Sequence, residues 1–181
     1  QRGQQLAPVM ADATMRVHAM FGRMSDLVAK IQAVRGGADA AAAKLPANDP
    51  LRERLAALSA DADTLRKEIV ATKEGGAITG EERLREHMDN LYGGLIGYEG
   101  KPADTLIAYT DVLQRRLEDL ETRFGSLRDG VLKQVNDGLG TKGMPKIALP
   151  DSAPTAWRYS GNPDTMPAAF RNHRKAGKLR K

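Results

Sequence analysis

The histidines are the residues of this chain that most plainly offer chemistry, because imidazole can bind a metal or transfer a proton near neutral pH. They are His18, His87 and His173, and none lies three or four residues from another. A helix brings metal ligands together at that spacing, so the paired nitrogens of a helical zinc or di-iron site are lacking. His87 stands beside Glu86 and Asp89, which could bind a cation, but we interpret it as a partly exposed polar residue.

Other catalytic signatures are equally weak. The chain has no cysteine, which excludes disulfides, thiolate metal sites and cysteine nucleophiles. Gly93, Gly94, Gly97 and Gly100 cluster, but they form neither a P-loop motif nor a dinucleotide-binding motif after a strand, so we interpret them as a turn between helices. Acidic and arginine side chains alternate between residues 115 and 123, as on the solvent face of a long helix. We therefore expect no enzyme activity, no cofactor and no metal.

The basic charge is concentrated at the C-terminus. The net charge is +5, yet residues 171–181 contain six Lys or Arg and no acid. The other 170 residues carry 22 basic and 23 acidic groups. Such a run can contact phosphates, and it is also typical of a solvated, disordered end. The candidate contacts for an anionic partner are Arg171, Arg174, Lys175, Lys178, Arg180 and Lys181.

The composition favours an all-α fold. Of 181 residues, 41% are hydrophobic but only 4% are aromatic, so the core must consist of Leu, Ala, Val, Ile and Met. No run approaches the roughly 18 apolar residues that span a bilayer, so we expect no transmembrane segment. Gln1 begins the chain without an initiator Met, from which we expect a piece of something longer. Nothing in the residues themselves identifies a compartment.

Two long helices are predicted in the first half. From Pro8 to Arg35, apolar residues recur at spacings of three and four, and Gly36-Gly37 is a plausible stop. Asp49 and Pro50 then form a helix start. The apolar residues of the first helix are Val17, Phe21, Met24, Leu27, Val28, Ile31 and Val34; those of the second, Leu51, Leu55, Leu58, Ala62, Leu65 and Ile69, form a heptad seam.

Two further helices follow Gly75-Gly76. Thr79 and Glu82 have capping-box spacing before a short third helix with a face of Leu84, Met88, Leu91 and Leu95. Pro102 opens a fourth helix of about 50 Å. Its face comprises Leu106, Tyr109, Leu113, Leu117, Leu120, Phe124, Leu127 and Val131. We also expect Met10, Met15, Met20 and Met24 to fill gaps in the core.

The pattern predicts two regions: a helical bundle domain over residues 1–150 and an extended or disordered basic tail over residues 151–181. Five of nine prolines fall between residues 145 and 167, which excludes a long regular element there. Short loops and heptad seams predict an elongated antiparallel three-helix bundle of the three long helices, with the short helix turning the chain into the last one. Hydrophobic side chains could still anchor parts of this region to the bundle: Ile147, Leu149, Trp157, Tyr159 and Phe170.

Two loops and the order of the helices suggest a family. The resemblance lies in the runs 91–124 and 131–147 and in an opening helix over residues 15–35. The matching motifs are Leu91-Tyr92, Gly100-Lys101-Pro102-Ala103 and Gly143-Met144-Pro145-Lys146-Ile147. Over roughly residues 7–150 this pattern resembles the C-terminal helical region of bacterial sortilin-like proteins, the large BNR-repeat β-propeller proteins often labelled glycosyl hydrolases. The Pro-rich extension after Pro150 departs from that pattern.

The resemblance implies a non-catalytic helical module that braces or pairs a larger propeller protein, in an extracytoplasmic compartment. Its partner would be the remainder of that parent or another protein, and any hydrolase activity would belong to the propellers. The alternative from the residues alone is a coiled-coil adaptor that binds nucleic acid through its basic C-terminal tail. For the helical module we expect Leu117 and Leu120 to lie in the central seam.

Overall fold

The computed structural model describes residues 2–71, 82–97 and 104–154, and this part of the chain is helical without any β-strand. The predicted all-α class is therefore confirmed. The elements are α1 (Arg2–Ala42), α2 (Pro50–Ile69), α3 (Leu84–Ile96), α4 (Asp104–Leu127), the π-helical turn η1 (Arg128–Leu132) and α5 (Lys133–Thr141).

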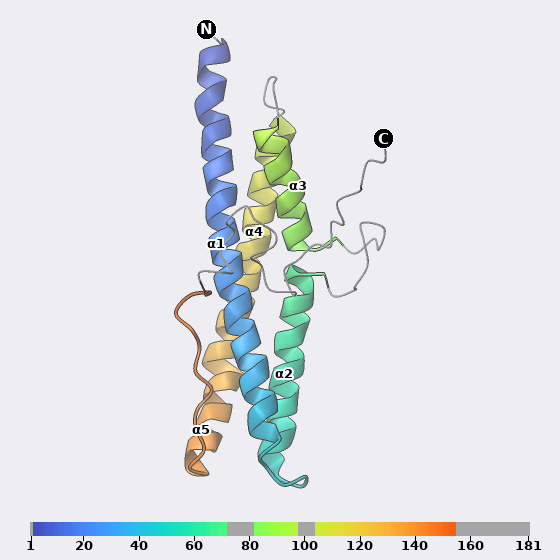
Figure 1. The fold of residues 1–181 in the computed structure, drawn as a ribbon, viewed down its shortest axis with the longest axis vertical. Coiled ribbons are helices and arrows are strands. Elements are labelled where there is room, and N and C mark those ends of the chain that lie inside the picture. Colours follow the sequence, from blue (N-terminus) through green and yellow to red (C-terminus); the bar gives the residue numbers. More distant parts are fainter. Residues whose placement is uncertain (1, 72–81, 98–103, 155–181) are drawn as a thin grey trace, which may run out of the picture.

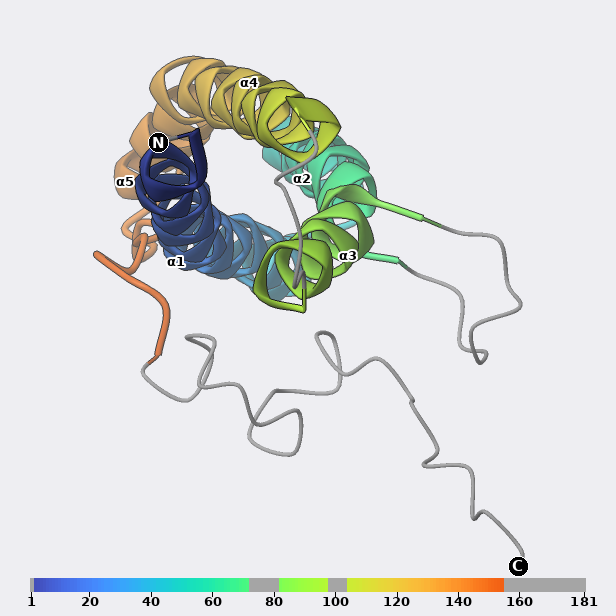
Figure 2. The same ribbon diagram turned by 90° about the horizontal axis from the view of Figure 1, so that it is seen from above.

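The helices form an elongated molecule (Figure 1). α1 runs down its whole length, and α4, η1 and α5 run in the same direction beside it. α2 and α3 run in the opposite direction and lie nearly end to end, α2 beside the C-terminal half of α1 and α3 beside its N-terminal half. Seen end-on, the helices surround a common axis (Figure 2). One continuous core of Leu, Val, Ile, Ala, Met and Phe side chains fills this axis.

α1 is longer than predicted, because Gly36 and Gly37 do not stop it. All seven predicted apolar residues of this helix are buried. The helix also continues through the alanines to Ala42, with Ala38 and Ala41 buried. Glycine costs a helix only about 1 kcal/mol relative to alanine, and packing against a neighbouring segment outweighs that cost here. A Cβ on Gly37 would lie 2.7 Å from Ile147 Cγ2, so this glycine permits a close contact.

α2 begins as predicted. The Asp49 side chain caps it by accepting a hydrogen bond of 2.9 Å from the Leu51 N–H. All six residues of the predicted heptad seam are buried. The helix ends at Ile69, before the predicted stop at Gly75-Gly76, which lies outside the described residues.

α3 starts later than expected. Thr79 lies outside the described residues and Glu82 precedes the helix, whose first residue is Leu84. The Glu86 carboxylate accepts a hydrogen bond of 3.0 Å from the Arg83 N–H, a capping contact displaced by four residues from the predicted one. The predicted face of four residues is buried, and it packs toward α1 and α4.

The last long helix contains a register shift that the spacing did not predict. Leu113, Leu117, Leu120 and Phe124 are buried as expected, but Val131 is 37% exposed. Leu132 takes the buried position instead, because η1 adds one residue to a turn of the helix. Beyond this turn, Val135 and Leu139 restore the three-four spacing, and the helix continues through Gly138 to Thr141.

Residues 142–154 form an extended segment, here called the strap, that turns back from α5 and runs along α1 (Figure 1). Gly143 makes the turn with a φ of 67°. Ile147 is buried, and Leu149 packs against the core, so these two predicted anchors are confirmed. The strap crosses the predicted boundary at residue 150, and Ala153 is also buried. Trp157, Tyr159 and Phe170 lie outside the described residues.

The four methionines of α1 differ in burial. Met20 and Met24 are buried and Met10 packs against the core, but Met15 is 73% exposed, so its predicted core position is wrong. Its spacing of five from both neighbours places it on the opposite face of α1. Within the described residues, no helix combines the length and apolar character that a membrane crossing requires.

Candidate interaction surface

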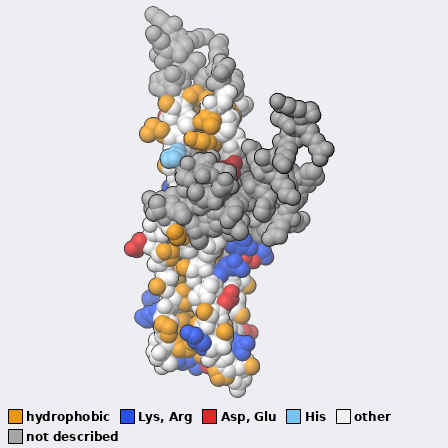
Figure 3. Space-filling view, in the orientation of Figure 1, with side chains coloured by type: hydrophobic (Ala, Val, Ile, Leu, Met, Phe, Trp, Pro, Cys, Tyr) orange, Lys and Arg blue, Asp and Glu red, His pale blue; other side chains and the backbone are white. Residues whose placement is uncertain are grey.

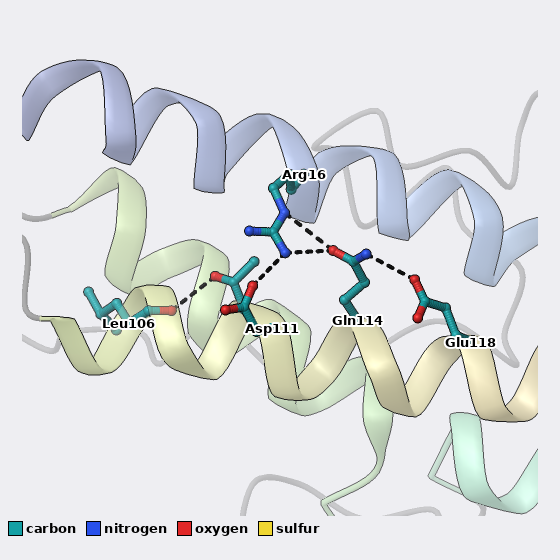
Figure 4. Close-up of polar contacts among 6 residues, drawn as sticks. Arg16, Leu106, Asp111, Gln114 and Glu118 are labelled. Atoms are coloured by element: carbon teal, nitrogen blue, oxygen red, sulfur yellow. Dashed lines mark hydrogen bonds and ion pairs between the residues drawn. The ribbon is translucent and has the colours of Figure 1, made fainter.

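A polar network joins α1 to α4 near the α3 end of the molecule (Figure 4). The Arg16 guanidinium donates to Asp111 Oδ1 at 2.6 Å and to Gln114 Oε1 at 2.6 Å. The Gln114 amide in turn donates to Glu118 at 2.9 Å. The planar guanidinium reaches two residues one helical turn apart, so it fixes the register between the two helices.

A second arginine repeats this bridge two turns further along α1. Arg23 donates through Nε to Glu121 Oε1 at 3.0 Å and through a terminal nitrogen to Oε2, a bidentate pair. The hydrogen bond to Glu121 raises the pKa of Arg23 above its ordinary value. Beside the pair is a shallow groove of about 260 Å³, whose lining includes Asp26, Lys30 and Phe124.

α2 is fastened to α1 through Asp63. Its carboxylate accepts from Arg66 at 2.8 Å and Lys67 at 2.8 Å on its own helix, and it pairs with Arg35 of α1 at 3.1 Å. Burial opposes ionisation of Asp63, but hydrogen bonds from Lys67 and Arg66 and the nearby positive charges outweigh it, so the pKa of Asp63 is lowered. This carboxylate therefore remains charged at neutral pH and joins the two helices.

Two further ion pairs tie α2 to the α4–α5 helix. Arg123 donates to both carboxylate oxygens of Glu68, at 2.9 and 2.6 Å, and this hydrogen bonding lowers the pKa of Glu68. At the far end of α2, Lys142 donates to the capping residue Asp49 at 2.7 Å. That bond, together with the one from the Leu51 N–H, lowers the pKa of Asp49.

The α3 end of the molecule exposes large apolar side chains. Val9 is 42%, Met15 73%, Ile96 61% and Val112 47% exposed. They belong to the N-terminal part of α1, the last turn of α3 and the first half of α4, which share this end (Figure 1). On the face shown in Figure 3, hydrophobic side chains gather near the upper end of the described surface, and Lys and Arg lie mainly lower down.

The residues predicted for an anionic partner, Arg171, Arg174, Lys175, Lys178, Arg180 and Lys181, all lie outside the described residues. His87 does not face a carboxylate cluster: its Nδ1 is 3.7 Å from Glu82, and its ring packs edge-on against Tyr109. Glu86 caps α3 instead of approaching it. In residues 2–71, 82–97 and 104–154, no group of three or more His, Cys, Asp or Glu could hold a metal.

The structure also places residues whose role the sequence did not indicate. Glu121 and Arg123 were predicted to be part of a solvent face, yet each bridges to a different helix. These pairings depend on which faces of α1, α2 and α4 are neighbours, and the spacing along one helix did not show it. Asn136, which binds the strap through two hydrogen bonds, had no sequence signal at all.

Comparison of the chain with known protein families, with curated proteins and with solved structures finds no match.

Proposed function

We propose that this chain is a non-catalytic helical module that braces or pairs a larger protein. The observation that carries the proposal is the row of arginine contacts between helices: Arg16 and Arg23 join α1 to α4, and Arg123 joins α4 to α2. Each exposed pair contributes little alone, but together they oppose sliding of the helices over a continuous apolar core. A stiff rod suits a brace or a spacer.

In the finer form of the proposal, the rod is an elongated antiparallel three-helix bundle over residues 1–150, and residues 151–181 form a basic tail. The burial of all six seam residues of α2, and of Leu113, Leu117, Leu120 and Phe124 in α4, supports this architecture. The parent would be a sortilin-like BNR-repeat β-propeller protein, and the module would then be extracytoplasmic. This assignment rests on the two loop motifs, of which Gly143 and Ile147 have structural roles in the strap.

The parent can be tested by determining the encoding reading frame upstream of Gln1. Propeller repeats are expected there, and an initiator methionine immediately upstream would contradict the sortilin-like assignment. The brace itself is tested by spin labels at Ala43→Cys and Ile96→Cys, which label only these sites because the chain has no cysteine. A stiff rod gives one narrow distance distribution, and a broad distribution in the folded protein would contradict a brace.

The second candidate is nucleic-acid binding through the basic tail, favoured by the six basic residues and absent acids of residues 171–181. An electrophoretic shift assay at two salt concentrations separates it from the first. A shift that weakens steeply with salt and disappears on truncation at Pro167 supports it. If the intact chain gives no shift at low salt, this candidate is excluded.

A further inference from the structure

The strap makes three hydrogen bonds to side chains of the bundle through its own backbone. Asn136 Nδ2 donates to the Ile147 carbonyl at 3.1 Å, and the Ile147 N–H donates to Asn136 Oδ1 at 2.7 Å. A carboxamide carries both a donor and an acceptor, so it satisfies both backbone groups of one extended residue whatever that residue is. Proteins that bind extended peptides obtain affinity in this way and specificity from side-chain pockets.

The pocket for the Ile147 side chain is on α1. The side chain is 8% exposed and lies against Gly37, where a Cβ would approach it to 2.7 Å. Any larger residue at position 37 would therefore displace the isoleucine. The site selects a compact aliphatic side chain at the residue whose backbone Asn136 binds.

A third contact fixes the direction of the strap. The Ala153 N–H donates to Asp26 Oδ1 at 2.7 Å. Ala153 lies six residues after Ile147, which spans at most about 20 Å at 3.3 Å per residue and less here, because residues 151 and 152 form a bend. Asp26 lies eleven residues before Gly37 on α1, about 16 Å along the helix. The strap is therefore long enough to join the two sites, and it runs antiparallel to α1 along the surface between α1 and α5.

We propose that this seam between α1 and α5 is a peptide-binding site, occupied by the strap of the same chain and able to accept the strap of a second copy. The strap itself shows which occupant fits. Its hinge is Gly143, the single residue with positive φ among those described. The hinge directly follows α5 at the end of the rod, where opening it would point the strap away from its own seam (Figure 1).

Concentration decides between the two arrangements. A short connection gives the chain's own strap an effective concentration on the order of millimolar, so we expect the wild-type strap to stay in its own seam at micromolar concentration. Exchange of straps between two chains becomes favoured when the strap binds its own seam weakly in each chain. The mixture must still contain one unaltered strap and one unaltered seam, which can bind each other. Two variants of the full chain meet this condition.

Asn136→Ala leaves the strap unaltered and removes the side chain that binds the strap backbone. Ile147→Ala leaves the seam unaltered and removes the side-chain anchor of the strap. Each full-length variant alone is expected to be monomeric in sedimentation velocity. An equimolar mixture is expected to form a dimer, detected also by energy transfer between dyes on Ala57→Cys, an exposed site in a chain without other cysteines. A mixture that stays monomeric, with both variants folded by circular dichroism, would overturn the proposal.

A peptide of residues 142–154 provides a second test that does not require dimers. We expect it to bind the full-length Ile147→Ala chain at least tenfold more tightly than the full-length double variant Asn136→Ala/Ile147→Ala. The matched control is Ile147→Val, which keeps a branched aliphatic anchor on the strap. We expect this variant to bind the peptide weakly, and to form no dimer when it replaces Ile147→Ala in the mixture with Asn136→Ala. Equal affinity for the single and the double variant would also overturn the proposal.

Discussion

The two halves of this rod are built from the same long helices but are fastened differently. Beside the C-terminal half of α1, the 20-residue α2 buries six residues. Asp63 of α2 pairs with Arg35 of α1, and the strap is hydrogen-bonded to α1 in the same half. Beside the N-terminal half, α3 has only 13 residues, and the polar contacts between helices include the partly exposed network of Arg16. The exposed large apolar side chains of Met15 and Ile96 also belong to this half. We therefore expect the α2 half to supply more of the stability and the α3 half to open at a lower free energy than the rest of the rod.

The largest expected effect comes from truncating the core in each half. Leu58→Ala removes a fully buried side chain of α2 and should lower the free energy of global unfolding by about 2–5 kcal/mol. Leu91→Ala in α3, also buried, should act mainly by opening the α3 half before the rest unfolds. Chemical denaturation followed by circular dichroism measures both. A single cooperative transition with equal losses for the two variants would contradict the difference between the halves.

Asp63→Asn should have the next largest effect, about 1–3 kcal/mol, because it removes the charged acceptor of three cationic side chains. The pH dependence has a definite sign. Since the pKa of Asp63 is lowered in the folded state, its contribution is present above its unfolded pKa, near 4, and is lost as pH falls through the folded value. Wild type and variant should therefore differ in melting temperature at pH 7 and converge in acid. A constant difference down to pH 2 would contradict this role.

Neighbouring glycines on α1 give a matched pair of smaller effects. Gly37→Ala introduces a Cβ 2.7 Å from Ile147 and should destabilise by about 1 kcal/mol, because overpacking outweighs the gain in helix propensity. Gly36→Ala meets nothing within 4 Å and should stabilise by about 0.5–1 kcal/mol. Thermal unfolding checks both signs. Stabilisation by both substitutions would show that the strap is not packed against Gly37.

The smallest effect is expected at Arg16. Arg16→Ala removes a half-exposed bridge between α1 and α4 and should cost about 0.2–1 kcal/mol at low salt, and less in high salt. Double-mutant cycles with Asp111→Ala measure the coupling directly. A coupling well above this range and unaffected by salt would mean that the α3 half is as firmly fastened as the α2 half.

Periodicity predicted most of the fold, since burial of α1, α2 and α3 follows the apolar spacing of the sequence. It was wrong where a single contact or a local irregularity of the helix determines where a helix ends or which residue is buried. Gly37 was predicted to stop a helix, but its missing side chain accommodates Ile147. Val131 was predicted to be buried, but η1 shifts the register by one residue.

The candidate surface was less predictable than the fold. Ion pairs such as Arg23 with Glu121 depend on which helix faces are neighbours, and a single helix pattern does not contain that information. The contact of Asn136 with Ile147 depends on the path by which the strap returns along the bundle. The prolines of this segment exclude a helix but do not determine that path. The residues predicted for an anionic partner lie in 171–181, outside the described residues, and that role remains a prediction.

Native-state hydrogen exchange with increasing denaturant tests the central difference between the halves most directly. The account predicts that backbone amides of α2 and of residues 27–38 exchange only through global unfolding, whereas the amides of α3 exchange through a smaller opening with a lower free energy. Equal exchange free energies in α2 and α3, merging into one global transition at all denaturant concentrations, would contradict it.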